Sequence, residues 1–75
     1  MKWYDPSRKM PKRFEPLLLY LPGYAPMQTV YEGYWSKGTD WCVNGGFHIT
    51  QADVVRWAEM PKYDPADDAE DGDYV

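Results

Sequence analysis

The sequence predicts a single all-β domain, an antiparallel meander of four or five strands that curls into a small, partly closed barrel. Three observations support this fold class. The hydrophobic runs are short, proline, glycine and asparagine separate them at close spacing, and one segment alternates strictly in polarity. We expect residues 1–62 to form the β domain, residues 1–15 of it as a flexible basic arm. Residues 63–75 are expected to be a disordered acidic tail.

The alternating segment Met27–Trp35 is the predicted central strand. Met27, Thr29 and Tyr31 would point to one face, and the residues between them to the other. β-branched and aromatic residues dominate the segment, as is typical of a half-buried strand. Tyr34 and Trp35 are neighbours, so they must face opposite sides, and one of them is expected to be exposed or covered by the arm.

The remaining strands are short and bounded by turn residues. Leu17–Leu21 lies between two prolines, which limit it to strand length. Asn44-Gly45-Gly46 is a strong turn signal between two further short segments. The strands expected beside the central one are Leu17–Leu21, Trp41–Val43, Phe47–Thr50 and Val54–Met60.

One segment is ambiguous between strand and helix. Thr50-Gln51-Ala52-Asp53 fits a capping-box pattern, so residues 51–59 could form a short helix. The valines and tryptophan that follow are poor helix formers, and Pro61 would stop a helix quickly. A turn at residues 50–53 followed by a strand is therefore the favoured prediction.

A chain of 75 residues with one cysteine needs its aromatic residues to stabilise a small core. It has four Trp, seven Tyr and two Phe, which bury the most area per residue. Trp3 is expected to pack the arm onto this core. The predicted core residues are Leu17, Leu19, Tyr31, Trp35, Trp41, Ile49, Val55 and Trp57.

Hydropathy and cysteine usage predict a cytoplasmic protein. The first residues lack the apolar centre of a signal peptide, and the longest apolar run, Leu17–Leu21, is far shorter than a membrane span. A single cysteine is typical of a reducing compartment and excludes a zinc site of the multi-cysteine kind. No membrane association is expected.

Charge is segregated to the two ends of the chain. The net charge is −4, but residues 1–15 carry five basic and two acidic side chains, whereas residues 64–75 carry six acidic side chains and no basic one. Such ends either attract each other or present two separate charged surfaces. The acidic residues are Asp64, Asp67, Asp68, Glu70, Asp71 and Asp73.

The order of several landmarks resembles a known family. Trp3 and Pro11 are followed by Leu17-Leu18-Leu19-Tyr20-Leu21-Pro22-Gly23, by Glu32-Gly33-Tyr34-Trp35, and by Val54-Val55-Arg56-Trp57 before Met60-Pro61. Over residues 3–62 this resembles the DUF551 family of small bacteriophage and prophage proteins, which has no assigned activity. The resemblance implies a phage accessory protein that acts in a bacterial host cytoplasm. Arg56 stands where that family has a histidine, and Met10 where it has a leucine.

Side chains suited to chemistry are few. His48 lies between Phe47 and Ile49, so in a strand it faces away from both, and no metal-binding spacing surrounds it. Cys42 is interpreted as a small buried hydrophobe, because no adjacent residue would activate a thiol. We therefore predict no catalytic residue, no cofactor and no metal. The one opening for an enzyme is that Asp40 and Asp53 lie on loops that could approach each other.

The favoured function is non-catalytic binding to a host or phage protein. The predicted partner surface combines Tyr24, Tyr34 and Arg56 with the acidic residues 64–73, and a homodimer through the same aromatics is equally allowed. Direct nucleic-acid binding is not expected, since few basic residues flank the aromatics. An alternative is that the acidic tail mimics nucleic acid and inhibits a host nucleic-acid enzyme or defence system. A small hydrolase is the remaining, less favoured alternative.

Overall fold

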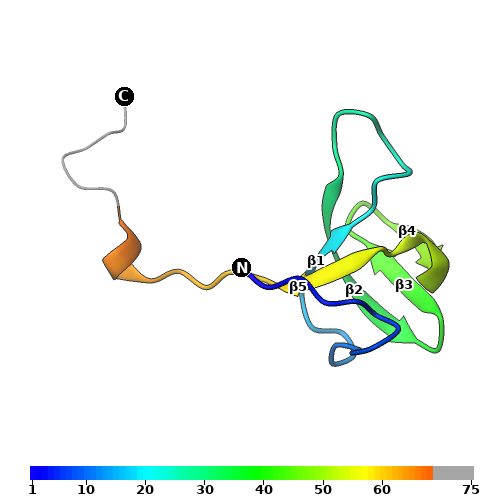
Figure 1. The fold of residues 1–75 in the computed structure, drawn as a ribbon, viewed down its shortest axis with the longest axis horizontal. Helices are drawn as coiled ribbons and strands as arrows, with labels where there is room; N and C mark the ends of the chain where they lie inside the picture. Colours follow the sequence, from blue (N-terminus) through cyan, green and yellow to red (C-terminus); the bar gives the residue numbers. More distant parts are fainter. Residues whose placement is uncertain (69–75) are drawn as a thin grey trace.

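The computed structural model describes residues 1–68 and shows one antiparallel sheet of five strands, in the spatial order β4-β3-β2-β1-β5 (Figure 1). The predicted all-β class is confirmed. Two short 3-10 turns, η1 and η2, accompany the strands, and residues 1–68 contain no α-helix. The elements are β1 (Leu17–Tyr20), β2 (Val30–Lys37), β3 (Asp40–Val43), β4 (Phe47–Thr50), η1 (Gln51–Asp53), β5 (Arg56–Glu59) and η2 (Pro65–Asp67).

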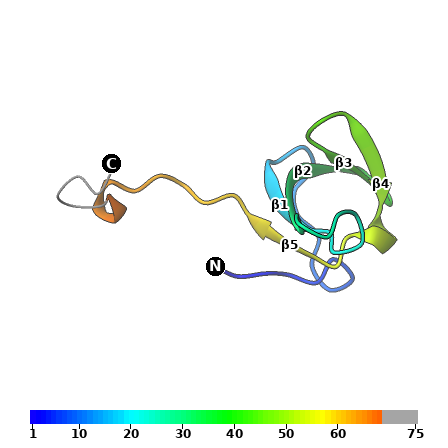
Figure 2. The ribbon, with the colours of Figure 1, turned by 90° about the horizontal axis from the view of Figure 1, so that it is seen from above.

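The first four strands form a meander, but the fifth does not continue it. After β4, η1 carries the chain to the far side of the sheet, where β5 pairs with β1. The Gln51 amide donates to the Thr39 carbonyl at 2.9 Å, and the Val55 amide donates to the Tyr20 carbonyl at 3.1 Å, which fixes both ends of this crossing. The strands bend around a common centre (Figure 2), yet the sheet is not closed into a barrel, because β4 and β5 remain its two edges.

The ambiguity at residues 50–59 resolves as predicted, into a turn followed by a strand. The Asp53 carboxylate lies 3.4 Å from both the amide and the hydroxyl of Thr50, so this residue closes the single 3-10 turn. The Val54 amide then donates to the Gln51 carbonyl at 3.1 Å, after which the backbone is extended. β-branched residues and Pro61 prevent the turn from growing into a helix.

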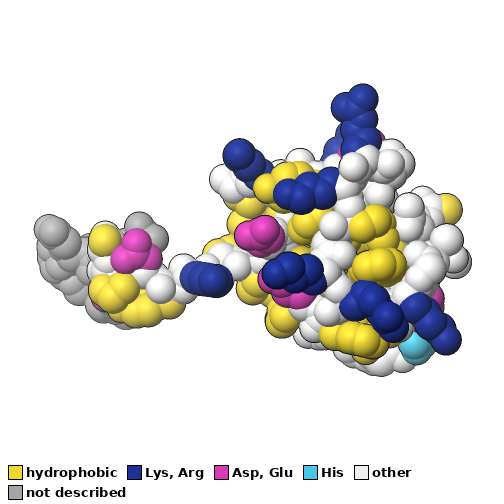
Figure 3. Space-filling view, turned by 90° about the horizontal axis from the view of Figure 1, so that it is seen from below, with side chains coloured by type: hydrophobic (Ala, Val, Ile, Leu, Met, Phe, Trp, Pro, Cys, Tyr) yellow, Lys and Arg dark blue, Asp and Glu magenta, His cyan; other side chains and the backbone are white. Residues whose placement is uncertain are grey.

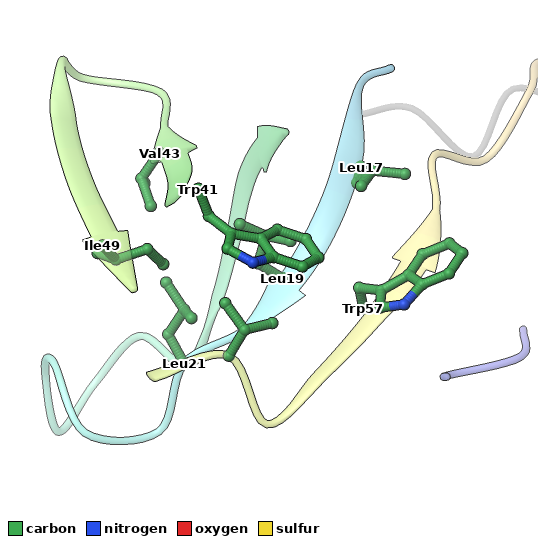
Figure 4. Close-up of a cluster of buried hydrophobic side chains, with 8 residues drawn as sticks. Leu17, Leu19, Leu21, Trp41, Val43, Ile49 and Trp57 are labelled. Carbon is green, nitrogen blue, oxygen red and sulfur yellow. The ribbon is translucent and has the colours of Figure 1, made fainter. Parts of the chain in front are cut away.

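The hydrophobic core fills the concave side of the curled sheet, where side chains from four strands point toward one another (Figure 4). Tyr31 and Trp35 pack against its margin and are only partly buried. One core prediction is wrong: Val55 is 39% exposed, whereas Val54 is 4% exposed and enters the core. The crossing from η1 turns Val54 inward before β5 begins. The buried core residues are Leu17, Leu19, Leu21, Trp41, Val43, Ile49, Val54 and Trp57.

The central strand begins later than predicted. β2 starts at Val30, and Met27 is 95% exposed in the loop before it. The polarity alternation extends beyond the paired strand, because β1 ends at Tyr20, which pairs with Val30. Thr29 keeps one contact, since its carbonyl accepts the Leu21 amide at 2.7 Å. Within β2, Tyr31 and Trp35 face the core while Tyr34 faces outward, as the alternation predicts.

The basic arm, which we expected to be flexible, is fixed to the sheet at several points. Tyr4 forms an antiparallel bridge with Trp57, and their rings lie 4.7 Å apart. The Phe14 amide donates to the Trp35 carbonyl at 2.9 Å, and Phe14 adopts a positive φ of 62° at this contact. Trp3 was predicted to anchor the arm, but it is partly exposed, and Tyr4 takes that role.

Beyond β5 the described chain extends away from the sheet as far as Asp68 (Figure 1). η2 is the only regular element of this segment among the described residues, and Asp64 caps it by accepting the Ala66 amide at 3.0 Å. No helix within residues 1–68 has both the length and the apolar character needed to cross a membrane.

Candidate functional site

Four polar side chains gather on the convex face of β2, β3 and β4. Tyr34 pairs with Cys42, and Cys42 pairs with His48, so the three form a row across adjacent strands. Asp40 lies two residues before Cys42 on β3 and therefore on the same face. Paired side chains of neighbouring strands are close enough to interact directly.

The Cys42 thiol and the Asp40 carboxylate both approach the same nitrogen of the His48 imidazole. Cys42 Sγ lies 3.3 Å from His48 Nδ1, and Asp40 Oδ1 lies 3.4 Å from the same nitrogen. Cys42 is buried, whereas the side chains of His48 and Asp40 are 67% and 38% exposed. The cluster is thus closed on the side of the sheet and open to solvent at the imidazole.

Cys42 is buried, as predicted, but burial is not its whole environment. It also touches an imidazole that the sequence places six positions away. The register of the β3–β4 hairpin is the sequence feature that predicts this contact. If Asn44-Gly45-Gly46 is the turn, residues at equal distances from Gly45 face each other, and Cys42 must then oppose His48. Gly45 and Gly46 have φ values of 112° and 94°, which only glycine adopts readily and which set this register.

The cluster lacks the arrangement of a nucleophilic triad. In a triad the third group contacts the imidazole nitrogen opposite the nucleophile, so that one nitrogen takes a proton while the other is held. Here Cys42 and Asp40 both approach Nδ1. The carboxylate therefore does not orient the ring for general-base work on the thiol.

Tyr34 flanks the cluster and is partly covered by the arm. Its ring lies 5.8 Å from that of Phe14, which confirms the expectation that one residue of the Tyr34–Trp35 pair is exposed or covered. The adjacent Cys42 side chain, mainly through a hydrogen bond, raises the pKa of Tyr34 above its ordinary value. Tyr34 thus remains a neutral hydroxyl beside the sulfur at neutral pH.

Tyr24 belongs to a different surface, at the end of the sheet where the β1–β2 loop meets β4. Its ring lies 6.3 Å from Tyr31 and 6.1 Å from Phe47. Its hydroxyl donates to Asp53 at 3.0 Å. Desolvation, followed by the hydrogen bond to Asp53 and the charge of that carboxylate, raises the pKa of Tyr24 above 10.0. Asp53 is engaged here and is not part of the Asp40 cluster, so the structure does not support the approach of Asp40 to Asp53 that was the one opening for an enzyme.

Arg56 lies on a third surface. Together with Trp3 and Tyr20 it lines a shallow pocket of about 300 Å³. Its guanidinium donates to the Val55 carbonyl at 2.6 Å and lies 3.9 Å from the Asp5 carboxylate. Tyr24, Tyr34 and Arg56, which we predicted to share one surface, therefore each contact different neighbours.

The acidic segment is only partly within the described residues. The Asp68 carboxylate accepts the Tyr63 hydroxyl at 2.7 Å, and Asp64 caps η2, so both make local contacts. Asp67 lies in η2. The predicted partner residues Glu70, Asp71 and Asp73 lie outside the described residues.

The two edges of the sheet differ. The β5 edge carries the bridge from Tyr4, whose amide and carbonyl both bond Trp57, at 2.7 and 3.0 Å. The β4 edge pairs with β3 on one side, and no other strand among residues 1–68 pairs with it. Alternate residues of β4 therefore direct backbone groups away from the sheet.

Basic side chains do not form a stripe on the face shown in Figure 3, where Lys and Arg are scattered among hydrophobic side chains. Comparison of the chain with protein-family models, with curated proteins and with solved structures found no match. The resemblance to the DUF551 family stays a prediction from the residues.

Proposed function

We propose that the domain is a non-catalytic protein-binding module that takes up an extended segment of its partner along β4. The observation that carries this proposal is the unpaired β4 edge beside an exposed aromatic group. This group, here called the loop-end group, consists of Tyr24 and Phe47, and the unpaired state of the edge refers to residues 1–68.

Backbone pairing supports the choice of β4 over β5. A sheet edge binds an extended peptide through main-chain hydrogen bonds, and proteins that avoid such pairing protect their edges with lysine, proline, bulges or covering segments. β5 has a covering segment, because Tyr4 is bridged to it. The sequence of β4, Phe-His-Ile-Thr, contains none of the protecting residues.

Side-chain anchors support a protein partner. Phe47 lies on the edge strand itself and is 41% exposed, and the Tyr24 ring beside it is also exposed. Large aromatic and methionine side chains are the usual anchors of protein interfaces. An extended peptide on β4 would place every second side chain against this group.

The assignment to a phage rests on the resemblance to the DUF551 family alone. It supports a phage accessory protein that binds a host or phage protein in the bacterial cytoplasm. The basic arm and the acidic residues 64–73 would add electrostatic steering to the encounter. The described acidic residues Asp64 and Asp68 make local hydrogen bonds, so they favour this auxiliary role over nucleic-acid mimicry.

The test is affinity capture from a prophage-bearing host with three forms of the protein. Phe47→Lys places a charge on the edge, and Val55→Lys is a matched control, because Val55 is 39% exposed and lies after the crossing. We expect the parent and Val55→Lys to retain the same partner and Phe47→Lys to lose it. Equal capture by all three forms would refute binding along β4.

Two further measurements separate the alternatives. Sedimentation of the purified chain over a range of concentrations shows whether the partner is a second copy, paired β4 to β4. Removal of residues 64–75 shows whether the acidic segment is the binding element. If truncation abolishes capture while Phe47→Lys does not, the nucleic-acid mimic is the correct function and the edge proposal is wrong.

A further inference from the structure

We propose that Asp40, Cys42 and His48 form a binding site for a divalent transition-metal ion, and that Zn²⁺ is the ion that this donor set fits best. One oxygen, one sulfur and one nitrogen from these residues all lie within 4.8 Å of one another. The site is separate from the proposed use of the β4 backbone, since it is built on side chains of the convex face.

Two of the three donor-atom distances match a tetrahedral site. Zinc bonds of about 2.0–2.3 Å to nitrogen, oxygen and sulfur place neighbouring ligands of a tetrahedron about 3.4–3.6 Å apart. The distance from Cys42 Sγ to His48 Nδ1 is 3.3 Å, and that from His48 Nδ1 to Asp40 Oδ1 is 3.4 Å. The third separation, between Cys42 Sγ and the Asp40 carboxylate, is within 4.8 Å, so the exposed Asp40 side chain must rotate toward the sulfur to close the site.

The chemistry of the donors selects the ion. Thiolate and imidazole are ligands of Zn²⁺ and similar ions, whereas Ca²⁺ and Mg²⁺ take oxygen ligands. Asp40 and His48 are exposed, so water can occupy the fourth position. Three protein ligands with one open position form a site that exchanges its metal with solvent.

The convergence on a single nitrogen also favours a cation over a hydrogen-bond network. Nδ1 can carry one proton, so it can donate to Asp40 or to Cys42 but cannot satisfy both fully. A metal ion replaces that proton and is attracted by carboxylate and thiolate together. Tyr34 beside Cys42 can donate a hydrogen bond to the bound sulfur, as outer groups commonly do in metal sites.

The ligands are held by rigid elements. Asp40 and Cys42 belong to β3 and His48 to β4, and the pairing of these strands fixes their separation. Cys42 and His48 are direct cross-strand partners, so folding alone brings the first two donors together. The chain contains one cysteine and one histidine, which makes any thiolate or imidazole signal assignable without ambiguity.

The test is a titration of the full, tag-free chain with Co²⁺ in the presence of a non-thiol reductant. We expect one Co²⁺ per chain, an absorption band from charge transfer between thiolate and cobalt, and displacement by Zn²⁺. His48→Gln should weaken binding at least about 100-fold, because loss of a direct ligand exceeds the 10–100-fold effect of outer groups. Glu32→Gln, which removes an exposed carboxylate of β2 that is not in the cluster, should bind like the parent.

We expect the variants to stay folded, so a loss of metal binding can be assigned to the missing ligand. His48 is exposed, so His48→Gln should unfold at the same temperature as the parent without metal. Zn²⁺ should raise the unfolding temperature of the parent and of Glu32→Gln but not that of His48→Gln. Absence of the thiolate band, one ion per two chains, or an equal rise for His48→Gln would each overturn the proposal.

Discussion

Trp57 Nε1 donates a hydrogen bond to the Lys9 carbonyl at 2.8 Å, across 48 positions of the sequence. The same indole is fully buried and stacks on Tyr4. Trp57 therefore belongs to the core and also holds the arm against β5. Trp41 is equally buried, but its Nε1 has no hydrogen-bond partner among residues 1–68.

The two indoles should respond differently to replacement by phenylalanine. Trp57→Phe loses volume and a hydrogen bond, whereas Trp41→Phe loses volume but also removes an unpaired buried donor. We expect Trp57→Phe to lower the free energy of unfolding by about 1–2 kcal/mol more than Trp41→Phe does. Urea denaturation followed by circular dichroism measures both. A Trp41→Phe variant that is the less stable of the two would contradict this assignment of the hydrogen bonds.

Gly33 is required by close packing between strands. A Cβ atom at this position would collide with the Cys42 carbonyl oxygen and would lie 2.8 Å from Leu19 Cδ1. Gly33→Ala should therefore lower the free energy of unfolding by about 1–3 kcal/mol, the usual cost of overpacking.

Gly23→Ala is the control for that substitution. No atom lies within 4 Å of a Cβ at Gly23, so this variant should be neutral or slightly more stable than the parent. Urea midpoints of the two variants give the comparison. If both shift the midpoint equally, the effect arises from the unfolded chain and not from the contact at Gly33.

Ionisation of Tyr24 should weaken the fold at alkaline pH. Burial and Asp53 raise the pKa of Tyr24 above its unfolded value of 10.0, so its contribution to stability is complete below that pH. The contribution is lost as the pH rises through the folded pKa. Tyr24→Phe should therefore show a smaller loss of stability as the pH rises above about 10.

Tyr63→Phe is the matched control for the alkaline experiment. Hydrogen bonding to Asp68 also raises the pKa of Tyr63, but both residues lie beyond the last strand of the sheet. Removing this hydroxyl should leave the alkaline unfolding of the sheet unchanged. An identical response of the two variants would show that the Tyr24–Asp53 bond does not stabilise the fold.

Local patterns were sufficient to predict the strands and the turns between them. The flanking prolines limited β1, and the Asn44-Gly45-Gly46 turn located β3 and β4. The poor helix formers after residue 53, together with Pro61, indicated a turn rather than a helix. What local patterns could not give was the crossing that takes β5 to the side of β1. The position of β5 depends on the burial of Val54. The sequence does not reveal which of the adjacent valines, Val54 or Val55, faces the core.

The cluster on the convex face shows a different limit. Cys42 and His48 were each judged from their sequence neighbours, although the partner of a strand residue lies on the adjacent strand. Reading the hairpin register outward from Gly45 predicts their contact, but the approach of Asp40 to the same nitrogen also depends on side-chain rotamers. The partner surface that combines Tyr24, Tyr34 and Arg56 stays a prediction, because the structure shows only that these residues contact different neighbours.

The most direct test of binding along β4 is the affinity of the captured partner for purified Phe47→Lys and Val55→Lys, measured by calorimetry. Both substitutions place lysine at positions of nearly equal exposure, 41% and 39%, so general effects of charge cancel. The account predicts that Phe47→Lys weakens binding about 30-fold, the effect of losing an anchor worth about 2 kcal/mol, while Val55→Lys binds like the parent. Equal affinities for the two variants, or a greater loss for Val55→Lys, would contradict it.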